Sequence, residues 1–144
     1  LWDIAQVNPK ISIKLKKDAD IKRVILCTGK VYFDLLEERD KREMADTYIL
    51  RVEQLYPYPD EALVRELSRF KNAKTVVWCQ EEPKNMGSWS YIEPLIEESL
   101  VKCDLSPKRA RYAGRKAAAS PATGQMSRHV NEQNDLVNQA LTIE

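Results

Sequence analysis

The sequence predicts an α/β domain, and three observations lead to that class. Three short runs of β-branched and aromatic residues, at 23–27, 48–52 and 75–79, have the composition of buried strands, and residues 109–113 form a fourth, more polar candidate. A helical stripe of apolar residues follows each of them. Repeated strand–helix–strand order is the form that right-handed crossovers of a parallel sheet require. We therefore expect a mostly parallel sheet with helices on both faces.

The run at residues 75–79 is unbroken, apolar and too short for a helix, so we expect a strand buried on both faces. Directly after it the polarity reverses at Gln80. Pro83 lacks the N–H that a further strand residue would donate, and Gly87 permits a turn. Because ligands and partners of an open α/β sheet meet the carboxyl ends of its strands, the loop at 80–89 is the first candidate for function.

The first strand is joined to a helix over residues 31–40 by a tight turn at 28–30. Apolar residues at 31, 32, 35 and 36 lie on one face of this helix. A turn of this kind can bind phosphate through backbone N–H groups. Neither G-x-G-x-x-G nor G-x-x-x-x-G-K-[ST] is present, so a plain helix start is favoured.

The second strand, at 48–52, leads to Pro57 and Pro59, which preclude regular structure. Asp60 is expected to cap the next helix. The apolar side chains of that helix are Leu63, Val64, Leu67 and Phe70.

Two further helices are predicted. Apolar positions between 91 and 100 form a stripe that we expect to be kinked or restarted at Pro94. After the fourth strand, a small-residue loop at 114–124 leads to a helix over residues 126–141. The aligned apolar residues of this last helix are Met126, Val130, Val137 and Leu141.

The length of 144 residues fits one domain with one core. Residues 1–20 have poor apolar periodicity and are predicted to be a linker or tail, in which Ile11, Ile13 and Leu15 alternate and can add a short edge strand. Residues 21–144 are predicted to form the domain.

The chain carries 23 Lys and Arg against 22 Asp and Glu, which gives no electrostatic argument for binding nucleic acid or an anionic membrane. No apolar run approaches the roughly 20 residues that span a bilayer, and the first residues lack the order of a secretion signal. We expect a soluble, unexported chain. Cys27, Cys79 and Cys103 contain no Cys-x-x-Cys pair and are interpreted as buried thiols of a reducing compartment.

The sequence offers little support for catalysis. His129 is the single histidine and has no evident relay partner or zinc-ligand set. Glu81 and Glu82 are adjacent in a loop and such side chains usually point apart, which favours a solvated or partner-facing loop over an acid/base pair. No serine lies in a nucleophile-elbow motif.

One cluster of charges is unbalanced, because its five basic residues are interrupted by no acidic one. Its members are Lys108, Arg109, Arg111, Arg115 and Lys116. Two interpretations stay open: a solvated strand edge, or an anion site toward which the turn at Gly114 directs Arg115 and Lys116.

Three stretches of the sequence together are specific to one family. They are residues 26–36 (LCTGKVYFDLL), residues 51–59 (RVEQLYPYP) taken with residues 78–87 (WCQEEPKNMG), and residues 112–124 (YAGRKAAASPATG). In this order and spacing they closely resemble the C-terminal domain of the thiamine-diphosphate-dependent 2-oxoglutarate dehydrogenase component, a transketolase-like enzyme. The resemblance runs from about residue 20 to the end, and residues 1–10 lie outside it.

The resemblance implies a three-layer α/β/α domain of the transketolase C-terminal type, with a mainly parallel sheet and one antiparallel edge strand. It also implies a fragment. The intact family chain decarboxylates 2-oxoglutarate on thiamine diphosphate and Mg²⁺ and passes the succinyl group to the lipoyl arm of the dihydrolipoyl succinyltransferase component, as part of the tricarboxylic acid cycle. The family's metal and diphosphate motif and its catalytic histidines lie upstream, so this segment should hold no catalytic, cofactor or metal residue.

Two functions follow as hypotheses. The first is an assembly domain that contacts upstream domains of its own chain and a homodimer mate, in the bacterial cytoplasm or, in a eukaryote, the mitochondrial matrix. Its expected interface residues are Gln80, Glu81, Glu82, Lys84, Asn85, Met86 and Trp89. The second is a free-standing module that binds a small anionic ligand such as acetyl-CoA, which regulates some bacterial relatives, at Arg51, Arg115 and Lys116.

Overall fold

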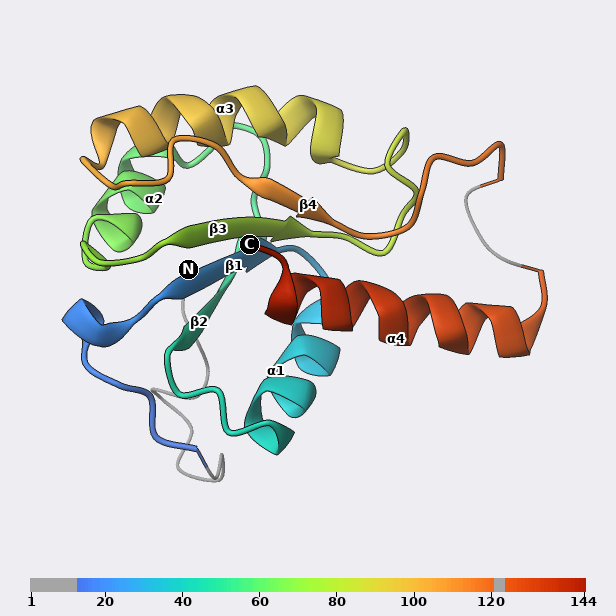
Figure 1. Cartoon of the computed structure of the whole chain (residues 1–144). Helices are drawn as coiled ribbons and strands as arrows, with labels where there is room; N and C mark the ends of the chain where they lie inside the picture. Colours follow the sequence, from blue (N-terminus) through green and yellow to red (C-terminus); the bar gives the residue numbers. More distant parts are fainter. Residues whose placement is uncertain (1–12, 121–123) are drawn as a thin grey trace.

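The computed structural model describes residues 13–120 and 124–144 of the chain (Figure 1). A short 3₁₀ turn, η2 (Asp18–Asp20), precedes the first strand. The elements that follow are β1 (Arg23–Cys27), α1 (Val31–Lys41), β2 (Thr47–Arg51), α2 (Asp60–Leu67), β3 (Thr75–Cys79), α3 (Trp89–Lys102), β4 (Arg111–Ala113) and α4 (Met126–Thr142). This order confirms the predicted alternation of strands and helices.

The four strands form one sheet in the order β2-β1-β3-β4, and every pairing in it is parallel. The antiparallel edge strand that the resemblance implies is therefore not present among the described residues. Ile13 and Leu15 belong to no strand, and Ile11 lies outside the described residues. Lys16 N–H donates to the Ala45 carbonyl at 2.9 Å, and Leu15 packs against the core on the α2 and α3 side of the sheet.

Helices cover both faces of the sheet, which makes three layers (Figure 1). Alternation along β1 divides its side chains between two cores: Val24 and Leu26 pack with α2 and α3, whereas Ile25 and Cys27 pack with α1 and α4. All four are completely buried. A strand buried on both faces is what the unbroken apolar runs predicted, and β3 shows the same arrangement.

The beginning of α2 differs from the prediction. Pro59 occupies the cap position, and no side chain accepts a capping hydrogen bond there. Asp60 is instead the first helical residue, and its carboxylate accepts from Ser99 Oγ and Lys102 Nζ, both at 2.6 Å. The carboxylate thus fastens α2 to α3 because both donors lie on the neighbouring helix.

Other details also depart from the expected ones. The restart at Pro94 is wrong, because α3 runs through this residue, and the kink stays a prediction. Pro94 has no N–H to donate to the backbone carbonyl one turn earlier in the helix. Because Pro94 is exposed, water can bond to that carbonyl instead. Strand β4 begins at Arg111 and not at residue 109, because pairing with β3 starts at Val77 opposite Arg111, and the Arg109 side chain turns to Glu97 at 3.2 Å.

Candidate functional site: the carboxyl edge of the sheet

The loop after β3 and the loop after β4 lie side by side at the carboxyl edge of the sheet. Lys84 N–H donates to the Arg115 carbonyl at 3.1 Å. The Asn85 side chain both donates to the Ala118 carbonyl at 2.9 Å and accepts from Ala118 N–H at 3.0 Å. A side-chain amide therefore continues the pairing of β3 with β4 past the point where the strands end.

Gln80 shapes the first of these loops from within. It is 2 % exposed. The two hydrogens of its Nε2 are shared among the carbonyls of Glu82, Pro83 and Met86, whose oxygens lie 2.9–3.1 Å from that nitrogen. Its Oε1 accepts from two donors at 3.0 Å, the indole N–H of Trp78 and the backbone N–H of Trp89. One buried amide thus satisfies the loop's carbonyls and the start of α3.

Trp89 belongs to the core of the domain. It is 7 % exposed, and its ring lies 5.3 Å from that of Tyr112. Gln80 and Trp89 are therefore removed from the interface proposed for this loop, since both side chains are buried inside the domain and cannot contact a partner unless the loop unfolds. Trp89 instead attaches the start of α3 to the sheet through Tyr112 of β4.

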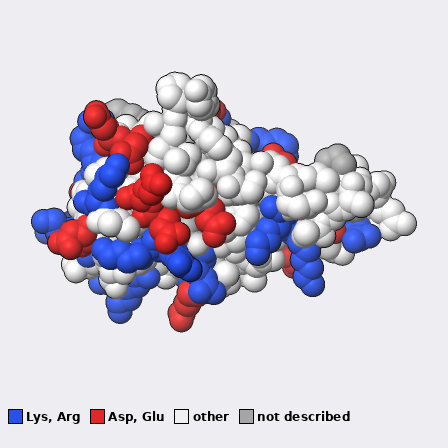
Figure 2. All heavy atoms as spheres, turned by 90° about the horizontal axis from the view of Figure 1, so that it is seen from above, with Lys and Arg blue, Asp and Glu red and all other residues white. Residues whose placement is uncertain are grey.

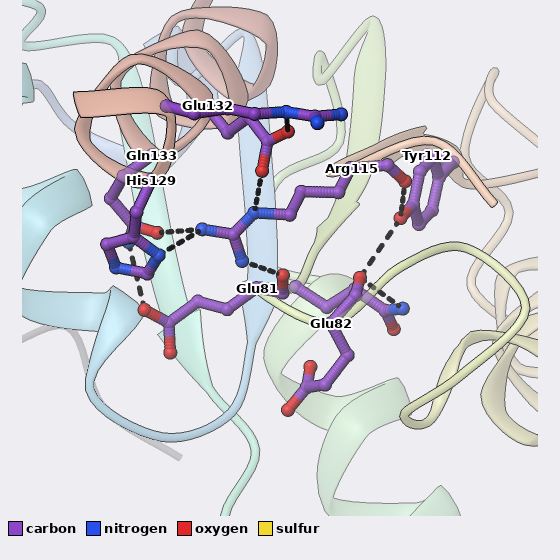
Figure 3. Close-up of polar contacts among 9 residues, drawn as sticks. Glu81, Glu82, Tyr112, Arg115, His129, Glu132 and Gln133 are labelled. Atoms are coloured by element: carbon purple, nitrogen blue, oxygen red, sulfur yellow. Dashed lines mark hydrogen bonds and ion pairs between the residues drawn. The ribbon is translucent and has the colours of Figure 1, made fainter. Parts of the chain in front are cut away.

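Arg115 joins the second loop to α4 (Figure 3). Its guanidinium donates to the Glu81 carbonyl, to Glu132 Oε2 at 3.0 Å and to Gln133 Oε1 at 3.1 Å. It also lies 3.4 Å from His129 Nδ1. The side chain is only 10 % exposed, so Arg115 is a structural clamp whose donors are already engaged.

Glu81 is the second junction of this network. Its carboxylate accepts from Lys30 Nζ at 2.7 Å and from Gln133 Nε2 at 2.9 Å. Gln133 Nε2 also donates to Asp34 on α1 at 2.8 Å. The hydrogen bond to Glu81 raises the pKa of Lys30. The turn before α1 thus directs its lysine to a neighbouring loop.

The carboxylates of Glu81 and Glu82 point in different directions, as predicted (Figure 3). The Glu82 side chain curls toward Gly87, where an added Cβ would meet it at 3.0 Å. This arrangement does not suit acid/base catalysis, which needs both groups aimed at one substrate.

The three basic residues of the predicted anion site are not brought together. Arg51 ends β2 and Arg115 follows β4, so three strand spacings, roughly 14 Å, separate their backbones. Arg51 donates to Glu53 at 2.6 Å and lies over the rings of Tyr32 and Phe33. The guanidinium of Arg51 therefore already has partners, at the opposite end of the strand order from Arg115. Of the three residues, only Lys116 is exposed.

A cleft of about 520 Å³ opens between the loop after β4 and α4. Its charged lining is mixed, with Arg115, Lys116 and Arg128 facing Glu132 and Asp135. Figure 2 shows that Lys and Arg are likewise interspersed with Asp and Glu over the face seen there. This mixture fits the near-zero net charge of the sequence.

Sequence reasoning missed the residues of α1 and α4 that complete the network, Asp34, Glu132 and Gln133. No motif marks them. The one available signal was Gln133 itself, a polar residue between Val130 and Val137 close to the apolar stripe of the helix.

Cys27, Cys79 and Cys103 are buried, as predicted, and form no disulfide within the described residues. Burial, with the nearby carboxylates of Glu81 and Asp34, raises the pKa of Cys79 to about 12. Burial also raises the pKa of Cys103. Thiols held protonated in this way are poor nucleophiles at neutral pH.

Within residues 13–120 and 124–144, no group of three or more His, Cys, Asp or Glu side chains is placed to hold a metal ion. None of the helices in the described part of the chain combines the length and apolar character needed to cross a bilayer.

The fold and its edge define the class of protein. A parallel three-layer domain whose carboxyl edge is closed by loop-to-loop and loop-to-helix contacts is consistent with a transketolase C-terminal-like domain. The comparison with known families is more specific: the chain belongs to the 2-oxoglutarate dehydrogenase C-terminal family, whose model matches residues 4–141. The match also corrects the expected limit, since residues 4–10 lie inside it.

Curated relatives agree with this family. The chain is 60% identical over 141 residues to the 2-oxoglutarate dehydrogenase E1 component of Brucella anthropi, and the match covers 98% of this chain. The corresponding protein of Brucella abortus is 59% identical over 141 residues. In each case the chain spans only 14% of the relative's own length.

Proposed function

We propose that this chain is the C-terminal assembly domain of a 2-oxoglutarate dehydrogenase E1 component, which contributes structure and dimer contacts but no catalytic group. The observation that carries the proposal is the closed carboxyl edge of the sheet. Arg115, Glu81 and Gln133, the polar groups placed where α/β domains bind ligands, are bonded to one another. The relatives' names and their much greater length support a partial role.

For the intact protein we propose the succinyl-transferring oxidoreductase reaction of the tricarboxylic acid cycle, dependent on thiamine diphosphate and Mg²⁺. Its partners would be the upstream domains of the same chain, a homodimer mate and the dihydrolipoyl succinyltransferase component. Bacterial relatives favour a cytoplasmic location, with the mitochondrial matrix as the eukaryotic equivalent. No nucleic acid or membrane partner is proposed, since the charge is balanced.

The proposed interface on the loop after β3 is narrower than the sequence indicated. It consists of Glu82, Lys84, Asn85 and Met86, because Glu81 is paired within the domain. Residues 1–20 are proposed as the linker to the upstream domains. Its described end is fastened by Arg69, which donates twice to the Asp18 carboxylate at 3.1 Å.

Titration calorimetry tests the absence of a cofactor site. The isolated segment, mixed with thiamine diphosphate and Mg²⁺, should give no saturable heat, whereas the intact protein should bind. Saturable binding to the segment in the micromolar range would overturn the proposal.

The exposed Lys116 in the cleft supports a second candidate, an anion site for a ligand such as acetyl-CoA. Arg128 replaces Arg51 as its companion, because it lines the same cleft and Arg51 does not. Millimolar acetyl-CoA should raise the melting temperature of the intact protein, and Lys116→Gln should reduce that rise while Lys14→Gln should not. No shift in the unmodified protein would remove this candidate.

A further inference from the structure

Helix α4 carries an apolar stripe that the domain covers for only half its length. Val137 and Leu141 on this stripe are 6 % and 1 % exposed. Met126 and Val130 follow the same helical spacing, yet they are 77 % and 48 % exposed. The first turns of α4 project past the carboxyl ends of the strands (Figure 1). The face that is core in one half of the helix is thus surface in the other.

Helix α4 is anchored at Glu132 and Gln133, where its projecting part begins. Arg115 bonds to Glu132 and Gln133, and Gln133 bonds to Asp34 and Glu81, so a polar belt crosses the helix where it leaves the sheet (Figure 3). Prior ordering lowers the entropic cost of binding. Apolar side chains next to a polar rim also have the composition of an interface.

We propose that Met126 and Val130 dock against the upstream part of the same polypeptide in the intact protein. This inference rests on the proposed assembly function and names one of its surfaces. Two apolar side chains are far fewer than a free-standing interface uses, since stable complexes bury about 1,200 Å² or more in total. A second copy or a separate protein would need a larger patch.

A partner that is tethered to the domain in the same polypeptide does not need a large apolar patch. Linked segments meet at effective concentrations of the order of millimolar, so a small contact is sufficient. The relatives provide such a segment, because this chain matches only 14% of their length.

Thiol labelling of the intact protein tests the contact. Met126→Cys and Val130→Cys are each compared with Asn131→Cys, a control on an exposed and outward-facing position of the same helix. Maleimide rates at each site are read by peptide mass, in the native and the urea-unfolded protein. We expect at least a tenfold slowing by the native fold at 126 and 130 and a much smaller slowing at 131. Labelling at 126 as fast as at 131 would overturn the proposal.

The identity of the occupant is tested by photo-crosslinking from the thiol at position 126 in mixed ¹⁴N and ¹⁵N chains that have exchanged subunits. Crosslinks to upstream peptides of the same isotope alone are expected. Mixed-isotope crosslinks would assign the surface to a second copy and contradict the proposal.

A parallel Met86→Cys variant distinguishes failure of the proposed docking of α4 from failure of the proposed assembly function. Protection at 86 with free labelling at 126 would refute this inference and leave the assembly function standing. Free labelling at both positions would refute both.

Discussion

At the scale of the single residue, Gln80 makes the most hydrogen bonds in the loop after β3. Both ends of its amide are used: the two hydrogens of Nε2 are shared among three carbonyls, and Oε1 accepts from two N–H groups. Three of these five hydrogen bonds, to the Pro83 carbonyl and from the N–H groups of Trp78 and Trp89, are buried from water, so an apolar substitution leaves their partners unsatisfied.

Gln80→Leu should therefore lower the free energy of unfolding by about 3 kcal/mol or more, since each unsatisfied buried polar group costs about 1–3 kcal/mol. Gln54→Leu, at an exposed loop position, is the control and should change it by less than about 0.5 kcal/mol. Urea unfolding of the segment measures both. Equal effects would show that the buried amide is not an organising contact.

Gly114 is required because neighbouring atoms leave no room for a Cβ at this position. A Cβ at this position would lie 2.5 Å from Tyr112 Oη and 2.9 Å from the Gln80 carbonyl oxygen. Gly114→Ala should destabilise the fold by about 1–3 kcal/mol, because backbone has to move. At Gly124 nothing lies within 4 Å of the added atom, so Gly124→Ala should be neutral or slightly stabilising. Thermal unfolding of the two variants gives the comparison, and a neutral Gly114→Ala would contradict it.

Because of the Cys79 thiol, we expect the free energy of unfolding to depend on pH in the alkaline range. Its pKa is raised from 9.0 to about 12 in the folded state, so the folded protein retains the proton that the unfolded chain releases. The stabilisation is complete below pH 9 and is lost as the pH rises toward 12. The advantage of the wild type over Cys79→Ala should narrow between pH 8 and 10.5 in urea unfolding. A constant difference would mean that the thiol does not titrate this way.

At the scale of the element, the boundary between α3 and its preceding loop matters most. The loop has one anchor turned inward, Trp89 against Tyr112, and one half-exposed, Met86. The composition of the loop suggested that both served a partner. Composition does not show the direction in which a side chain points, and the direction depends on where β4 places Tyr112.

Trp89→Ala should destabilise the segment by about 3–5 kcal/mol, the usual cost of removing a buried tryptophan. Met86→Ala should change the stability of the segment by less than about 0.5 kcal/mol while weakening the assembly of the intact protein. Urea unfolding and sedimentation of the intact variants provide the two measurements. A stable Trp89→Ala segment would return this residue to the interface.

At the scale of the whole molecule, the fold class, the four strands and their parallel pairing were predictable from the sequence, because apolar runs and crossover lengths are local signals. The order of the strands in the sheet was not predicted. The network at the carboxyl edge was not predictable. Arg115 meets Glu132 and Gln133 across a loop, and Gln133 meets Asp34 at a separation of 99 residues. No local pattern records which side chains a strand order brings together. The resemblance implied one site for Arg51 and Arg115, but β1 and β3 lie between the strand that Arg51 ends and the strand that Arg115 follows.

The central claim is that this domain assembles onto the rest of its protein through the loop at its carboxyl edge, and Met86 reports on that contact most directly. Hydroxyl-radical footprinting compares the oxidation rate of Met86 in the intact protein and in the isolated segment, after circular dichroism has shown that the segment is folded. A methionine-containing reporter peptide in both samples normalises the dose. The account predicts that oxidation of Met86 is at least fivefold slower in the intact protein. Equal rates would contradict it, because the loop would then face solvent in both.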